Sequence, residues 1–243
     1  MGGRLILCAT AFEMAPFLAQ FPSLVKQTWK SGSTSYALPD SETGKTAWSC
    51  LITGPGVFNT ATGLAAYLEH HTPELIMDTG FAGAYAMAGI DIGDVAAAVR
   101  ERYIHTGVGN ASTTLSPLPF DLIPGDEDTR SGVYRLTPEP TDVWLNRCGD
   151  ALSGENCRIV KGDFLTVSAI TRGDEAAGKL HQAFSPVMEA MEGAAAVHTA
   201  GCYNIPVIEI RAASNLAGER DKAKWDFDLA ARRVQNICNR FIG

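Results

Sequence analysis

The 243-residue sequence has the composition of an ordinary globular protein, with 46% hydrophobic and 19% charged residues. Its 27 acidic and 20 basic residues give a formal net charge of −7, which argues against a general affinity for nucleic acid or anionic membrane, because both need basic patches. No apolar run approaches the length of a transmembrane helix. The length suits a single large domain, residues 1–243, with a substantial core.

The cysteines and histidines do not follow a metal-binding pattern. Six cysteines are scattered without a CxxC pair, and the five histidines show no HxxxH spacing. We therefore expect no metal site, and we expect reduced cysteines in the core of a cytoplasmic protein. The stretch GPGVFN at 54–59 lacks the third glycine of a dinucleotide fingerprint, and no Walker loop occurs. The sequence thus predicts no cofactor.

The first elements alternate between strand and helix. RLILCAT (4–10) is a short apolar run that predicts a buried strand, and a helical pattern follows in EMAPFLAQF (13–21). A secretory signal is the alternative, but the run is short and continues directly into Glu13. The segments QTWKSGSTSYAL (27–38) and KTAWSCLIT (45–53) alternate around turn residues and predict antiparallel strands with a hairpin between them.

A helix, two strands and a long excursion come next. VFNTATGLAAYLEHH (57–71) carries a helical apolar stripe after a Gly-Pro-Gly turn. ELIMDTG (74–80) and GDVAAAV (93–99) predict two strands joined by a glycine-rich connection. Residues 105–137 hold most of the loop signals of the chain, and an excursion of this length predicts a functional lid or a binding loop.

The alternation of helices and strands continues to the end of the chain. The patterns predict a helix near 139–152, a strand near 157–162, a helix near 173–183, a strand at 205–214 and a helix at about 226–241. This order predicts an α/β fold with three αβα layers, in which helices cover both faces of a mixed, mostly parallel, twisted sheet.

The stretch SPVMEAMEGAAAVHTA (185–200) combines acids with a small, apolar sequence. It predicts one helical segment with Glu189 and Glu192 at its start, and nothing charged occurs for several residues after Gly193. Acids at a helix start are favoured by the helix dipole. The small, apolar residues after Gly193 also fit a segment that places one of its acids in a pocket.

Four stretches resemble the nucleoside phosphorylase and nucleosidase superfamily. They are CATAFEMAPFL (8–18), TGPGVFNTATGL (53–64), DTGFAGA (78–84), and MEAMEGAAAVH followed by IRAASN (188–215). The ordered set covers nearly the whole chain apart from 105–137. The resemblance implies the three-layer fold and cleavage of the N-glycosidic bond of a purine nucleoside, a small-molecule substrate.

The resemblance also implies roles for individual residues. Met191 and Glu192 match the ribose clamp, in which the carboxylate accepts from the 2′- and 3′-hydroxyls and the methionine packs against the sugar. Glu189 fits a helix-start charge better. Glu13 lies just after the first predicted strand, where ligands gather in open α/β sheets. It matches the glutamate that activates water in nucleosidases, and its alternative is a helix-capping acid.

The nucleophile is predicted to be water and not phosphate. A bound phosphate dianion requires arginine and hydroxyl donors beside the ribose. In the phosphorylase branch an arginine and a serine flank the glycine of the segment at 78–84, whereas this chain has Asp78 and Phe81 there. An acid and a bulky ring would repel and exclude phosphate, and Glu13 adds further negative charge.

Asn215 indicates which purine base the site binds. In the adenosine-type nucleosidases the corresponding strand ends in Ser-Asp, and the aspartic acid protonates N7 of adenine; this chain has Ser214-Asn215. An amide donates one hydrogen bond and accepts another, which suits a 6-oxopurine such as hypoxanthine. A strand-end turn is the structural alternative for this residue.

The segment SNLAGERDKAKWDFDLA (214–230) resembles futalosine hydrolase, a branch that removes hypoxanthine from futalosine on an alternative route to menaquinone. The resemblance implies a cation for the carboxylated 5′ group, with the candidates Arg102, His105, Arg220, Lys222 and Lys224. It also implies that Leu165 or its neighbour Phe164 stacks on the purine, and that Thr166 contributes backbone contacts to the base.

Three other functions remain open. The nearest is a methylthioadenosine/adenosylhomocysteine nucleosidase, which includes activity on the 6-amino analogue of futalosine. The others are a phosphorylase and a non-catalytic nucleoside-binding protein. The resemblance also implies a homo-oligomer, at least a dimer, in which 105–137 closes a neighbour's pocket.

Overall fold

The structure is a computed structural model that describes residues 3–39, 46–109, 114–152 and 154–243. Its strands are β1 (Arg4–Cys8), β2 (Val25–Thr28), β3 (Thr34–Pro39), β4 (Thr46–Ile52), β5 (Leu75–Ala84), β6 (Val95–Tyr103), β7 (Val133–Arg135), β8 (Ile159–Thr166), β9 (Met188–Ala190) and β10 (Val207–Leu216). Its α-helices are α1 (Ala11–Leu18), α2 (Val57–Leu68), α3 (Pro138–Leu152), α4 (Asp174–Phe184), α5 (Gly193–Cys202) and α6 (Phe227–Ile242).

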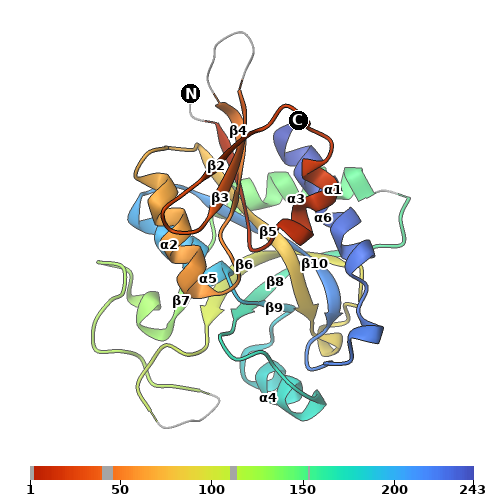
Figure 1. Cartoon of the computed structure of the whole chain (residues 1–243). Coiled ribbons are helices and arrows are strands. Elements are labelled where there is room, and N and C mark those ends of the chain that lie inside the picture. The colour runs from red at the N-terminus through yellow and green to blue at the C-terminus, as the bar shows by residue number, and fades with distance from the viewer. Residues whose placement is uncertain (1–2, 40–45, 110–113, 153) are drawn as a thin grey trace.

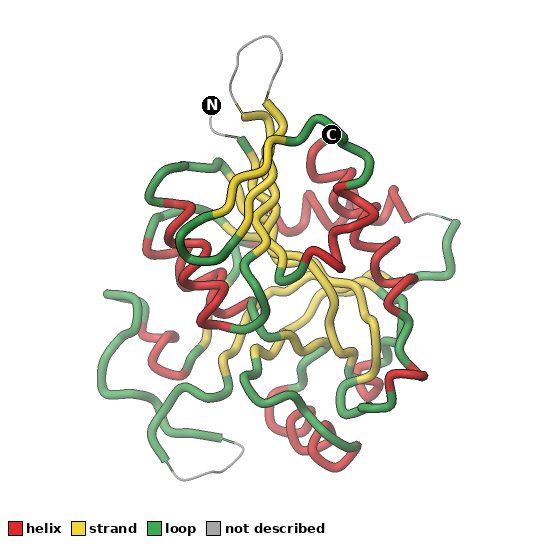
Figure 2. The backbone as a smooth tube through the Cα atoms, in the orientation of Figure 1, coloured by secondary structure: helices red, strands yellow, loops and turns green. Residues whose placement is uncertain are grey.

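One mixed sheet runs through the molecule, in the order β10-β6-β8-β9-β5-β1-β4-β3-β2. β4, β1, β5 and β10 run parallel to one another at the centre, whereas β2 and β3 add antiparallel strands at one edge. β10 also pairs with β5, so β5, β10, β6, β8 and β9 close into a ring. The curled lower strands in Figure 2 belong to this ring.

Helices cover both faces of the sheet, as the alternating sequence pattern predicts. In β1, Ile6 and Cys8 point into a core shared with α1, α3 and α6, whereas Leu5 and Leu7 point into a second core with α2 and α5. This alternation is the period of two that a strand imposes on its side chains. Figure 1 shows the two helix groups on opposite sides of the strands. The mixed α/β fold is therefore confirmed.

Several predicted elements differ from the structure. The stretch 185–200 does not form one helical segment, because 188–190 is strand β9 between β5 and β8, and the helix begins at Gly193. The strands predicted at 74–80, at 93–99 and near 157–162 extend to Ala84, Tyr103 and Thr166. Pairing with neighbouring strands, which a single sequence does not show, sets these boundaries.

The antiparallel strands predicted within 27–38 and 45–53 are confirmed by the pairing of β3 with β4, although the connection at 40–45 lies outside the described residues. The first segment contributes to two strands, β2 and β3, which also pair with each other. The excursion at 105–137 contains the 3₁₀ turn Glu127–Ser131 and strand β7 in its described part. No helix among the described residues is long and apolar enough to cross a membrane.

All six cysteines are free. Four are buried, but Cys202 at the end of α5 is exposed, so the prediction that every thiol lies in the core is wrong for this residue. No cluster of potential metal ligands occurs within the ranges that the structure describes.

Candidate active site

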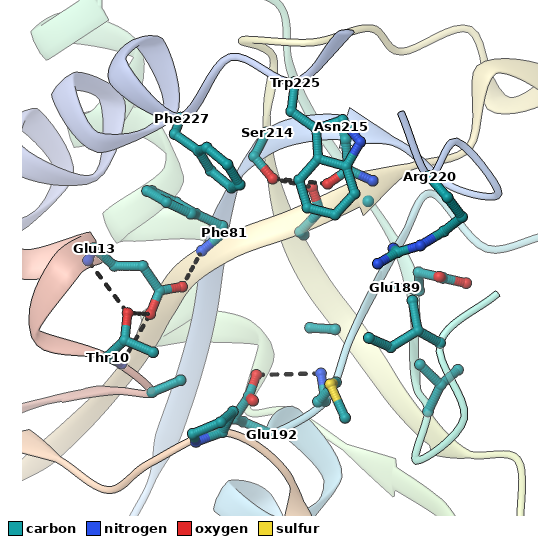
Figure 3. A pocket seen from close by; sticks show the side chains of 18 residues that line it. Thr10, Glu13, Phe81, Glu189, Glu192, Ser214, Asn215, Arg220, Trp225 and Phe227 are labelled. Atoms are coloured by element: carbon teal, nitrogen blue, oxygen red, sulfur yellow. Dashed lines mark hydrogen bonds between the residues drawn. The ribbon is translucent and has the colours of Figure 1, made fainter. Parts of the chain in front are cut away.

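A pocket lies at the carboxyl ends of β1, β5, β9 and β10, the position where ligands bind in α/β sheets. Five of the residues expected at the site line it, and Figure 3 shows the side chains of Glu13, Phe81, Glu192 and Asn215 around one space. The five residues are Glu13, Phe81, Met191, Glu192 and Asn215. These residues lie up to 202 positions apart in the sequence, and the fold brings them together.

Glu13 is held at both carboxylate oxygens. Its Oε1 accepts from the backbone N–H of Phe81 at 2.8 Å, and its Oε2 accepts from the N–H and hydroxyl of Thr10 at 2.9 and 2.6 Å. Thr10 and Glu13 also form a capping box at the start of α1. Glu13 is therefore a helix-capping acid, as the alternative predicted, and the same carboxylate also lines the pocket.

Glu192 is fixed in the pocket wall by two backbone groups. Oε1 accepts from the N–H of Gly56 at 2.9 Å, and Oε2 accepts from the N–H of Met191 at 3.1 Å. Burial raises the pKa of Glu192, and the positive charge of Arg211 together with the Gly56 N–H acts in the opposite direction. The carboxylate thus faces the pocket in a fixed orientation without a direct cationic hydrogen bond.

Arg211 lies behind these two acids and was not singled out from the sequence, although it belongs to the IRAASN stretch. It is fully buried and donates to Asp78 and Glu209, each at 2.6 Å. Its Nη1 lies 3.5 Å from Oε2 of Glu192 and makes no hydrogen bond within the described residues. A Cβ built at Gly80 would lie 2.8 Å from Oε1 of Glu13 and 3.3 Å from Nη1 of Arg211. The Nη1 N–H groups of Arg211 therefore lie close to Glu13 as well as to Glu192.

The expectation that Asp78 repels phosphate is wrong. Its side chain is 1% exposed, does not line the pocket, and is neutralised by Arg211. The reason is that Asp78 points toward a buried arginine across the β5–β10 pairing, which a sequence pattern does not reveal. Phe81, by contrast, lines the pocket, and its backbone N–H is already occupied by Glu13.

Two further buried acids, Glu101 and Glu209, face each other beneath the start of α5. A Cβ at Gly193 would clash with Oε1 of Glu101 and Oε2 of Glu209 together, and neither of these oxygens has a donor among the described residues. Burial raises the pKa of Glu101 to about 7. Two facing carboxyl oxygens need a proton between them, so the pair shares one.

Asn215 lies at the end of β10 with its amide oriented by its neighbour. The hydroxyl of Ser214 donates to Oδ1 at 2.8 Å, and Nδ2 donates to the carbonyl of Leu216 at 2.9 Å. The second Nδ2 hydrogen and the second lone pair of Oδ1 remain for a ligand. The strand-end alternative does not account for the position of Asn215 in the pocket wall.

An aromatic wall covers one side of the pocket. Phe81 stacks with Phe227 at a centroid distance of 5.7 Å, and Trp225 packs edge-on to Phe227 at 5.3 Å. Phe12, 59% exposed, meets both phenylalanines at the pocket rim. Apolar rings beside two carboxylates and an amide form a site suited to a ligand with one flat apolar face and one polar edge.

Three expected substrate contacts do not line the pocket. Phe164 and Leu165 are fully buried in the core, and the hydroxyl of Thr166 donates to Glu101 at 2.6 Å. Val167 and Ile170, which come after β8, line the pocket instead. Leu165 and Val167 share one face of the chain, and residue 167 reaches the pocket because it lies two positions nearer the open end of the ring.

Glu189 does not have the helix-start role expected from the sequence. It lies in β9 and not at a helix start, and it lines the pocket with a side chain only 6% exposed. The hydroxyls of Tyr85 and Thr171 both donate to its Oε2 at 2.6 Å. Of the five expected cations, Arg220 lines the pocket, packed over the Trp225 ring at 4.8 Å, and the other four do not.

The chain matches the family described as "Phosphorylase superfamily" over residues 4–243. The chain belongs to this superfamily. Futalosine hydrolase of Thermus thermophilus is 31% identical over 197 residues, covering 81% of this chain and 82% of the relative. Futalosine hydrolase of Streptomyces coelicolor is 27% identical, covering 91% of this chain and 87% of the relative.

The chain is also similar to nucleosidases that act, by their names, on other nucleosides. A 5′-methylthioadenosine/S-adenosylhomocysteine nucleosidase of Bacillus cytotoxicus is 27% identical, covering 79% of each chain. The nucleosidase of that name from Colwellia psychrerythraea, solved with adenine, superposes with a TM-score of 0.80 at 18% identity and covers 100% of this chain and 95% of its own. At this identity the likeness shows the fold alone.

Proposed function

We propose that this enzyme hydrolyses the N-glycosidic bond of futalosine and releases hypoxanthine. Its superfamily membership and its nucleosidase relatives support an enzyme that acts on N-glycosyl compounds. The observation that carries the proposal is the convergence of Glu13, Glu192 and Asn215 on one pocket. A binding protein without catalysis could use Glu192 to hold the ribose, but it would not need a general base at the position of Glu13.

The arrangement suits cleavage through a positively charged sugar. Glu192 accepts from the ribose hydroxyls, and Met191 packs against the sugar. Water adds its oxygen to C1′ as the bond from C1′ to N9 breaks, and Glu13 takes the proton of the water. The bonding electron pair leaves with the purine, whose negative charge is stabilised by the free Nδ2 hydrogen of Asn215.

Water is favoured over phosphate by the position of Glu13. Its carboxylate accepts from the backbone N–H of Phe81 at 2.8 Å, a group that would otherwise be a donor for an anion. The nearby Arg211 is fully buried and paired with Asp78 and Glu209. A phosphate dianion would therefore meet a negative charge where it needs donors.

Arg220 is the cation that we assign to the carboxylated 5′ group. It lines the pocket, and it forms no ion pair within the described part of the chain. Hydrolysis of futalosine would place the enzyme on the alternative route to menaquinone.

A methylthioadenosine/adenosylhomocysteine nucleosidase is the second candidate, favoured by the relative from Bacillus cytotoxicus. The decisive assay incubates the enzyme with futalosine, its 6-amino analogue, methylthioadenosine and adenosylhomocysteine, with and without phosphate, and identifies the free base by mass spectrometry. We expect hypoxanthine from futalosine without phosphate. Adenine from methylthioadenosine with no turnover of futalosine would refute the proposal, and strict phosphate dependence would indicate a phosphorylase.

A further inference from the structure

The two oxygens of the Glu13 carboxylate have unequal sets of partners. Within the described residues, Oε2 accepts from the backbone N–H and the hydroxyl of Thr10, at 2.9 and 2.6 Å, and from the thiol of Cys8 at 3.4 Å. In the same part of the chain, Oε1 accepts from the backbone N–H of Phe81 alone, at 2.8 Å. A carboxylate oxygen has about two lone pairs, so Oε2 is fully occupied and Oε1 keeps one free lone pair.

The Cys8 thiol is a donor to Glu13 and not a second base. Its side chain is 1% exposed at the end of β1. Burial raises the pKa of Cys8, and the negative charge of Glu13 raises it further. The thiol therefore keeps its hydrogen, and this weak S–H donor is the third partner of Oε2.

The structure keeps space beside Oε1. A Cβ built at Gly80 would lie 2.8 Å from this oxygen, so any side chain at residue 80 would collide with it. Figure 3 shows the Glu13 carboxylate at the pocket with Thr10 and Phe81 as its hydrogen-bond partners. Because Glu13 lines the pocket, the free lone pair of Oε1 is the one that remains for a water molecule.

We propose that the hydroxyl of Thr10 is a positioning group, which occupies Oε2 of Glu13 and leaves Oε1 as the basic oxygen that takes the proton of the attacking water. The inference deepens the proposed function and rests on it for the identity of the nucleophile. The oxygen of the water bonds to C1′, the water proton moves to Oε1, and the electron pair of the C1′–N9 bond leaves with the purine. Thr10 takes no proton itself and acts through Glu13.

The Thr10 hydroxyl makes the shortest hydrogen bond to Glu13 in the described part of the chain. Without it, Oε2 would keep one backbone N–H and the weak thiol as donors. The carboxylate would then be held less firmly, and proton transfer requires a fixed distance between the base and the water. Loss of this hydroxyl should therefore slow the chemical step and leave the binding of the base unchanged.

Thr10→Val and Thr10→Ser separate the hydroxyl from the rest of the side chain. Valine keeps the branched shape and lacks the hydroxyl, whereas serine keeps the hydroxyl. Valine also lacks the oxygen that accepts from the N–H of Glu13 at 3.3 Å, so the start of α1 loses its cap. Each variant is therefore also made in Glu13→Gln, because a positioning residue has little effect on the rate once the base that it positions is absent.

The experiment measures the single-turnover rate of base release, on whichever of the four assayed nucleosides is hydrolysed. We expect Thr10→Val to lower this rate by about 10-fold or more when Glu13 is present, and by less than about threefold in Glu13→Gln. Thr10→Ser should recover most of the rate. Calorimetry with the released base should give an unchanged dissociation constant, and its stoichiometry corrects for the active fraction.

Thr141→Val is the matched control. Thr141 is 2% exposed in α3, and its hydroxyl donates to the carbonyl of Thr137 at 2.8 Å, outside the pocket lining. This variant also loses a buried hydroxyl, and we expect it to keep the wild-type rate. Thermal melting checks the fold of every variant. If Thr10→Val does not fold, Thr10→Ala and Thr10→Ser differ by the hydroxyl and serve for the same comparison.

An equal loss of rate in both backgrounds would overturn the inference, because the effect of Thr10 would then not pass through Glu13. A Thr10→Val enzyme with the wild-type rate would overturn it too. If futalosine is hydrolysed and either result is found, only the role of Thr10 is wrong. If a different nucleoside is hydrolysed and the losses differ as expected, only the substrate assignment is wrong. If none is hydrolysed without phosphate, both proposals are wrong.

Discussion

At the residue scale, Glu13 illustrates how one side chain can serve both local structure and chemistry. The capping box with Thr10 fixes the start of α1, and the bond from the Phe81 N–H ties the same carboxylate to β5. Such a residue is rigid before substrate arrives. Preorganisation of this kind is what a general base requires, because a small displacement from the attacking water reduces the rate.

Glu13→Gln keeps the size and shape of the residue but removes its basicity, together with one of the two oxygens that accept from Phe81 and Thr10. We expect kcat to fall by about 10²–10⁴-fold, the usual contribution of general-base catalysis, while the affinity for a nucleoside changes little. Steady-state kinetics together with calorimetry of product binding would check this. A variant with wild-type turnover would contradict the role of Glu13.

Asn215→Ala removes the donor that stabilises the departing base. We expect kcat/KM for the nucleoside to fall by about 10–100-fold, because a hydrogen bond to a charged group contributes roughly 1.5–3 kcal/mol. The measurement is the initial rate of base release. Asn236→Ala is a matched control on α6, since its amide bonds to Glu155 at 3.2 Å away from the pocket lining. Equal rates for the two variants would argue against the role of Asn215.

At the element scale, the strands of the closed ring bury more charge than the helices around it. Strand β10 contributes Glu209 and Arg211, β6 contributes Glu101, and β5 contributes Asp78. With one guanidinium among these acids, removal of a single partner would leave a buried charge uncompensated. The shared proton between Glu101 and Glu209 reduces that charge.

The acid pair makes stability dependent on pH. Burial raises the pKa of Glu101 from 4.5 to about 7, so the fold favours the protonated form. This contribution to the free energy of unfolding is complete below pH 4.5 and is lost as the pH rises through 7. This pair therefore lowers the free energy of unfolding as the pH rises across the neutral range.

Glu101→Gln tests the pair, because an amide can accept from Thr166 and donate to Glu209 as a protonated acid does. We expect the variant and the wild type to have similar free energies of unfolding at pH 5, and the variant to be more stable by about 1–3 kcal/mol at pH 8.5. Urea denaturation at both pH values measures this. If the free energies of unfolding of variant and wild type differed by the same amount at both pH values, the two acids would share no proton.

At the scale of the whole molecule, the pocket rim and the 105–137 excursion both carry exposed apolar side chains. Phe12 at the rim is 59% exposed, and Val108 and Phe120 on the excursion are 52% and 57% exposed. We expect the exposed apolar side chains of the excursion to be covered in an assembly. The expectation of a dimer in which this excursion covers a neighbour's pocket stays a prediction.

Light scattering should give about twice the 25.9 kDa mass of one chain. Phe120→Ser should shift the equilibrium toward the monomer and raise KM for the nucleoside, because the pocket then loses its cover. The exposed Val143→Ser, on α3 outside the excursion, is the control. A wild-type monomer with full activity would contradict this arrangement.

The sequence by itself determined the α/β fold and the candidates Glu13, Phe81, Met191, Glu192 and Asn215. Strand and helix periodicity are local properties, and these residues belong to ordered motifs. The tertiary structure alone decided what the candidates face. The placement of Glu189 in β9 and the closure of the ring depend on pairings between strands distant in the chain. For the same reason only the fold showed that Asp78 pairs with Arg211, and that the pocket is reached by Val167 and not by Phe164, Leu165 or Thr166.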